Sequence, residues 1–454
     1  MKKIPDTNII MHHENKNWMT SLIKHPERIL PTTFFLLCLT GAILLFMPFS
    51  TTKSISFIDS LFTSVSAVCV TGLVVLDSGK DFTNFGQFAI ALLIQTGGLG
   101  IMSFTSIIFI LLGKRMSLSQ EKTVRNIFDV ESQDEIKQSV KLIFKFTFLV
   151  EAIGATILST CFIFTEHSFW TGIKYGLFTS ISAFCNAGFF LKGTNLMDYQ
   201  TNPIVLFTIS FLIIIGGIAP ATCVIFPNLL KRKKLPPMAT IVFYTTLSLL
   251  FIGALFFFIS EYSGVLEGMN TIDKISNAWF QSATTRTAGF NSIDFGKINA
   301  GTFLLTVLLM IAGGSPGGTA GGIKTGAIGL LFLTCYNTIN SKSNIICNKQ
   351  ITPVIIQKAI SLALAYLTVL LLSIIMLLTT QSISPTHLIF EATSALGTVG
   401  LSMGATTSLD EIGKIIIIST MFIGRVAPAT LLCYLNAKGS EMNISYPDAK
   451  ITLT

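Results

Sequence analysis

The chain has 454 residues, of which 51% are hydrophobic and only 12% are charged, and its mean hydropathy is +0.69. Soluble domains carry about twice that charged fraction, so the composition excludes a soluble enzyme, with or without a membrane anchor. The net charge of +8 would suit a nucleic acid, but the basic residues cluster in 1–28, 114–141 and 231–234, between apolar segments. This clustering is typical of the cytoplasmic segments of a multi-pass membrane protein. We therefore expect a multi-pass membrane protein with both termini in the cytoplasm and no nucleic-acid partner.

In chain order, the sequence runs four times from a long apolar segment through a short semi-polar segment to a glycine turn and a second long apolar segment. The first long helices are expected at 30–48, 140–164, 237–260 and 354–380, the short helices at 57–68, 169–184, 271–284 and 385–396, and the second long helices at 84–112, 202–230, 299–338 and 409–437. The short segments fall below the roughly 20 residues that cross a bilayer, so they must enter and leave on one side. Re-entrant backbone is tolerated only where it is buried in protein or lines water. The sequence therefore predicts an all-α integral membrane protein with four tandem helix–pore loop–helix repeats. Eight transmembrane helices and four re-entrant pore helices would surround a pseudo-fourfold pore.

A recurring glycine fixes the register of these repeats. It occurs as Gly72, Gly188, Gly289 and Gly400. A phenylalanine precedes it, at Phe62, Phe178, Phe280 and Phe390, and a second glycine cluster follows, at Gly97, Gly216, Gly313 and Gly424. Chance does not place two anchors in register four times. The expected parts are a cytoplasmic tail at 1–29, repeats at 30–112, 140–230, 237–338 and 354–437, and a cytoplasmic tail at 438–454.

The four glycine turns have the residue types needed to coordinate an alkali cation. None of the turns carries Asp or Glu, so any ligands must be backbone carbonyls. Rings of carbonyls from four loops replace an ion's hydration shell in potassium channels, and glycine tolerates the backbone angles that this requires. Glycines can also simply permit close helix packing, but four in register behind non-spanning helices favour a selectivity filter. The expected filter residues are Val70, Thr71, Gly72, Asn186, Ala187, Gly188, Thr287, Ala288, Gly289, Thr398, Val399 and Gly400.

Residues 299–340 are too many for one straight transmembrane helix. Such a helix would be about 63 Å long, twice the roughly 30 Å hydrocarbon core. Its centre, GGSPGGTAGG, holds six glycines and a proline, the poorest helix formers. We therefore expect a loop at 313–322, inside the membrane and across the ion path, where it acts as a gate; the alternative is a glycine-rich cytoplasmic loop. The expected gate residues are Gly313, Gly314, Gly317, Gly318, Gly321, Gly322, Lys324 and Arg425.

A third cation, Arg286, precedes the third glycine turn. A charge at the centre of a membrane helix costs about 2.5–3.5 kcal/mol, so it needs a partner or a purpose. We expect Arg286 to brace the third filter loop by donating to nearby carbonyls or to a carboxylate such as Glu391.

The phrases RTAGFNSID (286–294) and GGTAGGIKT (317–325) resemble the Trk/Ktr/HKT superfamily of potassium transporters, and the likeness extends over residues 30–437. The short polar segment before the first helix is similar to KtrB, the membrane subunit of bacterial Ktr systems. The resemblance implies uptake of K+, stimulated by Na+, across a bacterial plasma membrane. It also implies a homodimer, with one pore in each protomer, seated on a cytosolic ring of KtrA-type subunits that bind ATP or ADP. It implies no covalently bound cofactor.

Three other interpretations need comparison. A secondary transporter with alternating access usually has two repeats with broken spanning helices, rather than four equal re-entrant loops. A membrane enzyme is disfavoured because the cysteines and histidines have no metal-ligand spacing, so we expect no enzymatic activity. A sodium-permeable carrier of the HKT type stays open, although glycine at all four filter positions favours potassium. The basic clusters are also suited to anionic membrane lipid.

Overall fold

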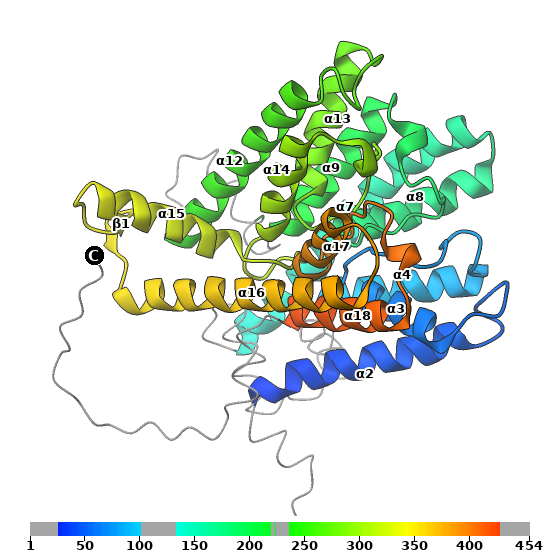
Figure 1. Cartoon of the computed structure of the whole chain (residues 1–454), viewed down its shortest axis with the longest axis horizontal. Coiled ribbons are helices and arrows are strands. Elements are labelled where there is room, and N and C mark those ends of the chain that lie inside the picture. Colours follow the sequence, from blue (N-terminus) through cyan, green and yellow to red (C-terminus); the bar gives the residue numbers. More distant parts are fainter. Residues whose placement is uncertain (1–25, 101–132, 219–222, 224–235, 427–454) are drawn as a thin grey trace, which may run out of the picture.

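The computed structural model describes residues 26–100, 133–218, 223 and 236–426, and it is mostly helical (Figure 1). In chain order the elements are α2 (Pro26–Phe46), α3 (Phe57–Val68), α4 (Asn84–Gly98), α7 (Gln133–Glu166), α8 (Phe169–Phe184), η1 (Met197–Tyr199), α9 (Pro203–Gly217), α12 (Pro237–Ser260), α13 (Thr271–Thr284), η2 (Phe295–Lys297), α14 (Ala300–Ile311), α15 (Thr325–Ile339), β1 (Ile345–Ile346), β2 (Lys349–Gln350), α16 (Pro353–Thr380), α17 (Pro385–Gly397), η3 (Thr406–Ser408) and α18 (Glu411–Val426). The two strands form one small antiparallel hairpin between α15 and α16.

The expected tail at 438–454, the tail residues 1–25 and most of the basic clusters lie outside the described residues. The second long helices expected at 84–112 and 202–230 lie partly outside the described residues. Within the described residues, α4 ends at Gly98 and α9 ends at Gly217. In place of one helix over 299–338, the structure has α14 and α15, joined by the segment 312–324.

The helices form four groups that contact one another in a ring. The groups are α2–α4, α7–α9, α12–α15 and α16–α18, and in each the first long helix packs on the short one. Between groups, α4 contacts α8, α9 contacts α13, α14 contacts α17, and α18 returns to contact α3. Each of the short helices α3, α8, α13 and α17 therefore contacts helices of its own group and of a neighbouring group.

Buried aromatic side chains hold neighbouring groups together. The recurring phenylalanines of the short helices are at most 6% exposed. Phe280 of α13 packs into the core of the α7–α9 group, and Phe390 of α17 packs into the core of the α12–α15 group. There the ring of Phe390 lies 5.7 Å from that of Phe295, centroid to centroid. Each such burial contributes about 1.5–3 kcal/mol, so the recurring phenylalanine stabilises the contact between repeats.

A repeated hydrogen bond fixes each of the first three short helices to its long partner. A serine hydroxyl donates to a carbonyl of the long helix over 2.7 Å, three residues before a glycine of that helix. A methyl group on that glycine would collide with the serine hydroxyl, so the glycine permits the approach. The bonds run from Ser64 to Cys38, from Ser180 to Glu151 and from Ser282 to Leu250, beside Gly41, Gly154 and Gly253.

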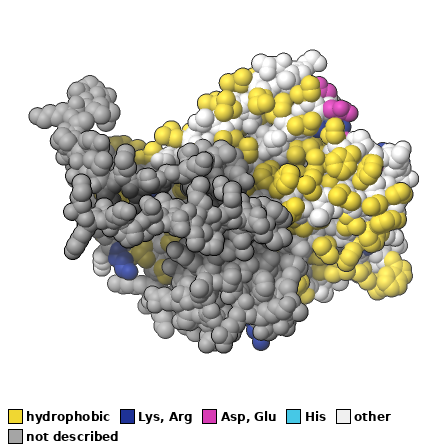
Figure 2. Space-filling model, turned by 90° about the horizontal axis from the view of Figure 1, so that it is seen from below, with side chains coloured by type: hydrophobic (Ala, Val, Ile, Leu, Met, Phe, Trp, Pro, Cys, Tyr) yellow, Lys and Arg dark blue, Asp and Glu magenta, His cyan; other side chains and the backbone are white. Residues whose placement is uncertain are grey.

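The outer surface of the helical groups is apolar. Three described helices contain segments long and apolar enough to cross a membrane, namely Lys141–Glu166, Pro237–Ser260 and Pro353–Thr380. Large side chains such as Phe211, Leu255 and Leu371 are about 60% exposed on the outer helices. Figure 2 shows hydrophobic side chains over much of the described surface, with acidic ones only near its edge. An apolar surface of this extent requires a lipid environment, so the chain is an integral membrane protein.

Candidate functional site

A turn follows each of the four short helices, and the four turns meet. In each turn the recurring glycine has φ between +69° and +93°, a left-handed backbone that glycine adopts without steric cost. A side chain on any of these glycines would collide with a carbonyl oxygen of another turn. The pairs are Gly72 with Ala187, Gly188 with Ala288, Gly289 with Val399, and Gly400 with Thr71. Because the last pair returns to the first turn, the turns form a closed ring, which we call the glycine ring.

A second left-handed residue lies two positions before each of these glycines. These residues are Val70, Asn186, Thr287 and Thr398, with φ between +49° and +71°. A left-handed conformation costs a residue with a side chain roughly 1–2 kcal/mol, and such strain is found mostly at functional sites. In all four turns the first and the third of the three residues expected to form the filter thus have a left-handed backbone, and all twelve residues are buried.

The glycine ring offers only neutral oxygen atoms. Its twelve residues include no carboxylate, and the hydroxyls of Thr71 and Thr398 have no hydrogen-bond partner. Nowhere in the described part of the chain do three His, Cys, Asp or Glu side chains gather as a metal site requires. Backbone carbonyls and hydroxyls are hard ligands that suit an alkali cation, as in known selectivity filters.

Hydroxyl groups of the short helices support the glycine ring, and the sequence reasoning missed them. Ser66 Oγ donates to the carbonyl of Leu73 over 2.7 Å and accepts from the N–H of Gly72 over 3.1 Å. Ser394 Oγ likewise accepts from the N–H of Gly400 over 3.0 Å. In the third turn Thr284 Oγ1 donates to the carbonyl of Phe290 over 2.7 Å. A Ser or Thr stands five or six residues before every recurring glycine in the sequence, but Ser182 Oγ of the second turn has no hydrogen-bond partner.

The segment 312–324 is a closed loop, which we call the α14–α15 loop. Its two ends are joined, because the N–H of Gly313 donates to the carbonyl of Ile323 over 2.9 Å. Its middle is tied to the end of α9, where Ser315 N–H donates to the carbonyl of Gly217 over 2.9 Å. Gly321 packs so closely on the side chain of Thr398 that a methyl group there would collide with it. The α14–α15 loop therefore lies directly against the fourth turn of the glycine ring.

Arg425 and Lys324, the two cations expected at the gate, both donate to carbonyls of this loop. Arg425 donates through Nη1 to the carbonyl of Thr319 and through Nη2 to that of Gly97, over 2.5 Å for the latter. Lys324 Nζ donates to the carbonyl of Ala320 over 2.6 Å. Neither cation pairs with a carboxylate of the described residues. Arg425 thus links the α14–α15 loop to the end of α4, across the groups.

The side chain of Arg286 makes no hydrogen bond with the described residues. Its side chain is 8% exposed, and its Nε atom is without a partner. The carboxylate of Glu391 is committed elsewhere, since it accepts from Ser402 Oγ and Thr406 Oγ1, both over 2.6 Å, and from the N–H of Met403 over 3.2 Å. Glu391 therefore holds the segment that follows the fourth turn, and the structure has no hydrogen bond between Arg286 and Glu391.

A charged cluster anchors the segment that follows the second turn. Lys192 Nζ lies 3.1 Å from Glu166 and 2.8 Å from Asp198. The hydrogen bond to Asp198 raises the pKa of Lys192, and Lys192 in turn lowers the pKa of Asp198. Both groups therefore stay charged at neutral pH.

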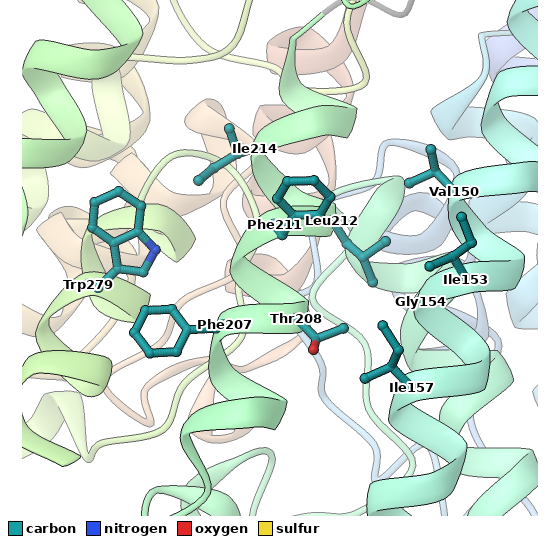
Figure 3. A pocket seen from close by; sticks show the side chains of 10 residues that line it. All are labelled: Val150, Ile153, Gly154, Ile157, Phe207, Thr208, Phe211, Leu212, Ile214 and Trp279. Atoms are coloured by element: carbon teal, nitrogen blue, oxygen red, sulfur yellow. The ribbon is translucent and has the colours of Figure 1, made fainter. Parts of the chain in front are cut away.

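An apolar cavity of about 650 Å³ lies between α7 and α9, beside Trp279 of α13 (Figure 3). Thr208 supplies its only hydroxyl, and the other lining side chains are apolar, with Phe207 and Phe211 on one wall. A cavity with one hydroxyl cannot replace a hydration shell, so among the described residues the glycine ring is the better candidate for an ion site.

The fold and the ring can now be compared with known proteins. Residues 10–445 match the TrkH family, described as cation transport proteins, and the chain belongs to that family. The Ktr system potassium uptake protein B of Bacillus subtilis (strain 168) is 41% identical, over 94% of this chain and 96% of the relative. The potassium/sodium uptake protein NtpJ of Enterococcus hirae is 35% identical, over 94% and 97%. In fold, the chain is similar to the crystal structure of the potassium transporter TrkH from Vibrio parahaemolyticus, with a TM-score of 0.71 over 94% of this chain and 86% of the other, at 18% identity.

The hydroxyl of Ser66 provides a first test. Ser66→Ala leaves the N–H of Gly72 and the carbonyl of Leu73 buried without that partner, at about 1–3 kcal/mol for each group. We expect the melting temperature of the purified protein to fall. Ser419→Ala is the matched control, because Ser419 is exposed and its hydroxyl bonds only within α18. Equal melting temperatures for the two variants would show that Ser66 does not support the turn.

Proposed function

We propose that this chain takes up potassium across the plasma membrane through a filter formed by the glycine ring. The observation that carries the proposal is the closure of four left-handed glycine turns on one another, with each glycine against a carbonyl of another turn. Such a ring, free of carboxylates, suits a dehydrated alkali cation. The relative from Bacillus subtilis, whose name states potassium uptake, supports the choice of ion.

The four short helices contribute to the same filter in this proposal. They act as re-entrant pore helices in four helix–pore loop–helix repeats, and each ends where its turn begins. The C-terminus of a helix carries a partial negative charge of roughly half an elementary charge. Four such ends around one ring would stabilise a cation beside it.

We further propose that the α14–α15 loop closes the ion path. The loop packs against Thr398 of the ring, and Arg425 holds it to the end of α4. A cation on this path would meet both a narrow constriction and the positive charges of Arg425 and Lys324. Opening the path requires breaking the bonds of Arg425 and shifting α15, which begins where the loop ends.

The proposed assembly is a homodimer on a cytosolic ring of nucleotide-binding subunits, with uptake stimulated by sodium and with cytoplasmic termini. The resemblance to bacterial Ktr systems supports this assembly, as does the name of the relative from Bacillus subtilis, which is one protein of a system. A second candidate function is uptake of both potassium and sodium. The name of the relative from Enterococcus hirae states both ions, and the permeability measurement below separates the two functions.

The filter is tested by Gly72→Ser, with Gly188→Ser and Gly289→Ser made in parallel. A side chain there collides with a carbonyl of another turn, which should displace the ligands. We expect the potassium-to-sodium permeability ratio in vesicles to fall about tenfold, which corresponds to about 1.4 kcal/mol. Gly301→Ser is the control, because a Cβ there would lie 3.7 Å from its nearest neighbour, an ordinary contact. An unchanged ratio in all three ring variants would exclude the glycine ring as the filter.

The gate is tested by Arg425→Ala and by deletion of Gly317 and Gly318. The Arg425 variant loses two charge-assisted hydrogen bonds, each contributing about 1.5–3 kcal/mol, so the open path should become more populated. We expect potassium uptake to rise about tenfold in cells that lack their own potassium systems, with selectivity unchanged. Arg425→Lys keeps the charge but not the two-carbonyl bridge, and it should give an intermediate rate. If both altered proteins reach the membrane in normal amounts and uptake does not rise, the loop is not the gate.

The assembly is tested by purification from the native membrane under mild conditions. We expect a stoichiometric cytosolic subunit to copurify, and we expect uptake by the complex to respond to ATP and ADP. Under this proposal the nucleotide binds to the cytosolic subunit, so removal of that subunit should abolish the response of uptake to ATP and ADP. A purified protein without such a subunit, indifferent to both nucleotides, would identify a solitary carrier instead.

A further inference from the structure

A second cavity lies beside the α14–α15 loop, far from the apolar cavity of Figure 3. It has a volume of about 580 Å³ and is bounded by α12, α15, α16 and the β1–β2 hairpin (Figure 1). Pro316 and Lys324 of the loop form part of its wall. The cavity therefore joins the surface of the molecule to the segment proposed as the gate.

The cavity has a basic end and an apolar end. Lys349 of the hairpin and Lys358 of α16 line it, both are exposed, and neither makes an ion pair with any described residue. No acidic residue occurs in the sequence from Thr325 to Phe390, and none lines the cavity. Apart from Lys324, which donates to Ala320, and Gln350 of the hairpin, the remaining wall is apolar, with Ile241, Leu330 and Leu362 among its residues. An occupant that satisfies both ends must be an anionic amphiphile.

The position of the two ends along α16 matches a bilayer leaflet. The 28 residues of α16 would form a helix about 42 Å long, which equals the thickness of a bilayer including its headgroups. Lys358 lies about 7–8 Å from the start of α16, and Leu362 about 13–14 Å. Lys358 is thus at headgroup depth, whereas Leu362 lies among the acyl chains.

We propose that this cavity binds an anionic phospholipid of the cytoplasmic leaflet and that the bound lipid holds the α14–α15 loop in its closed arrangement. The lipid phosphate would contact Lys349 and Lys358, and an acyl chain would lie along the apolar wall. Basic pockets between membrane helices on the cytoplasmic side are suited to such headgroups. The proposal rests on the cytoplasmic orientation and on the gate proposed above.

The coupling to the loop follows from the packing of α15. Gly326 and Gly329 bring α15 against α12, since a methyl group on either would collide with a side chain of α12. At the same place Lys324 Nζ donates to the carbonyl of Ala320. A shift of α15 would therefore change the walls of the cavity and the bonds of the loop together. A lipid that fits the cavity in this arrangement favours this arrangement over an open one, so it should lower the flux.

The first experiment measures binding. The purified full-length protein is supplied with phosphatidylglycerol, and retention is followed by native mass spectrometry and by the rise in melting temperature. Each lysine near an anionic lipid contributes roughly a fivefold gain in affinity, so Lys349→Gln with Lys358→Gln should weaken binding about 25-fold. Lys342→Gln with Lys145→Gln is the charge-matched control, because both lysines are exposed and neither lines the cavity. Leu362→Trp, which reduces the space in the apolar part and keeps every charge, should also weaken binding.

Equal retention of phosphatidylglycerol by the double lysine variant and by the control would overturn the proposed site. So would displacement of the lipid by inorganic phosphate, which would identify a site for a free anion. This readout does not depend on transport. A protein that binds the lipid but moves no potassium would therefore refute the proposed function and leave the lipid site standing.

The second experiment measures the effect on the gate. Rubidium uptake is compared in phosphatidylcholine vesicles with and without phosphatidylglycerol. We expect phosphatidylglycerol to lower uptake by the wild-type protein severalfold and to have no effect on the double lysine variant. If phosphatidylglycerol raises uptake, or lowers it equally in both proteins, the lipid does not hold the loop closed. The double variant is also compared with the wild-type protein in pure phosphatidylcholine. If the two differ there as much as they do with phosphatidylglycerol, the occupant is a segment of protein and the lipid proposal is wrong.

Discussion

The close contact of four glycine turns is the constraint on which the rest of the structure depends. Each turn brings a carbonyl against the backbone of another, and a Cβ at any of the four glycines would separate them. Glycine alone does not hold such turns, because it loses more conformational entropy on folding than any other residue. The turns are held from outside, by hydroxyls such as Ser66 and Ser394 and by short helices that pack on their own group and on a neighbouring one. The recurring phenylalanines and the 2.7 Å serine bonds keep those helices in place, so the same few residue types recur in the repeats.

In the proposed arrangement the α14–α15 loop lies within the membrane, where non-helical backbone must have its polar groups satisfied by protein or by water. The loop meets that requirement through protein. Its ends bond to each other, and its middle bonds to the carbonyls of Gly216 and Gly217 at the end of α9. Arg425 and Lys324 donate to two of its remaining carbonyls. The two cations are therefore not isolated charges in an apolar region, because carbonyl dipoles surround them. In the proposed mechanism these same bonds determine how readily the loop can move.

The parts that the sequence predicted are those whose signals are local. A short helix before a left-handed glycine leaves a continuous pattern, and α3, α8 and α13 coincide with the segments expected to form short helices. Contacts between distant segments leave no such pattern. The hydrogen bond from Arg425 to the carbonyl of Gly97 joins residues 328 positions apart. Neither the sequence around Arg425 nor the sequence around Gly97 indicates that the two residues meet. Glu391 was expected only as one possible acceptor for Arg286, beside nearby carbonyls, and hydroxyls close to Glu391 in the sequence satisfy its carboxylate instead. The apolar composition of the segment 84–112 likewise did not predict that α4 ends at Gly98.

The third repeat departs from the other three in a way that bears on how one loop could control a site built from four segments. In the first, second and fourth groups the second glycine anchor packs on the last carbonyls of its own short helix, as Gly97 does on Val68 and Gly424 on Leu396. In the third group Gly313 packs instead on Gly321 of the α14–α15 loop. The α14–α15 loop contacts Gly217 of the second group and Thr398 of the fourth, and Arg425 connects it to Gly97 of the first. A single segment is thus linked to each of the other groups, directly to the second and fourth and through Arg425 to the first. Since packed interfaces shift between discrete arrangements rather than deform continuously, displacement of this one segment would release all three contacts together, without any change in the glycine ring.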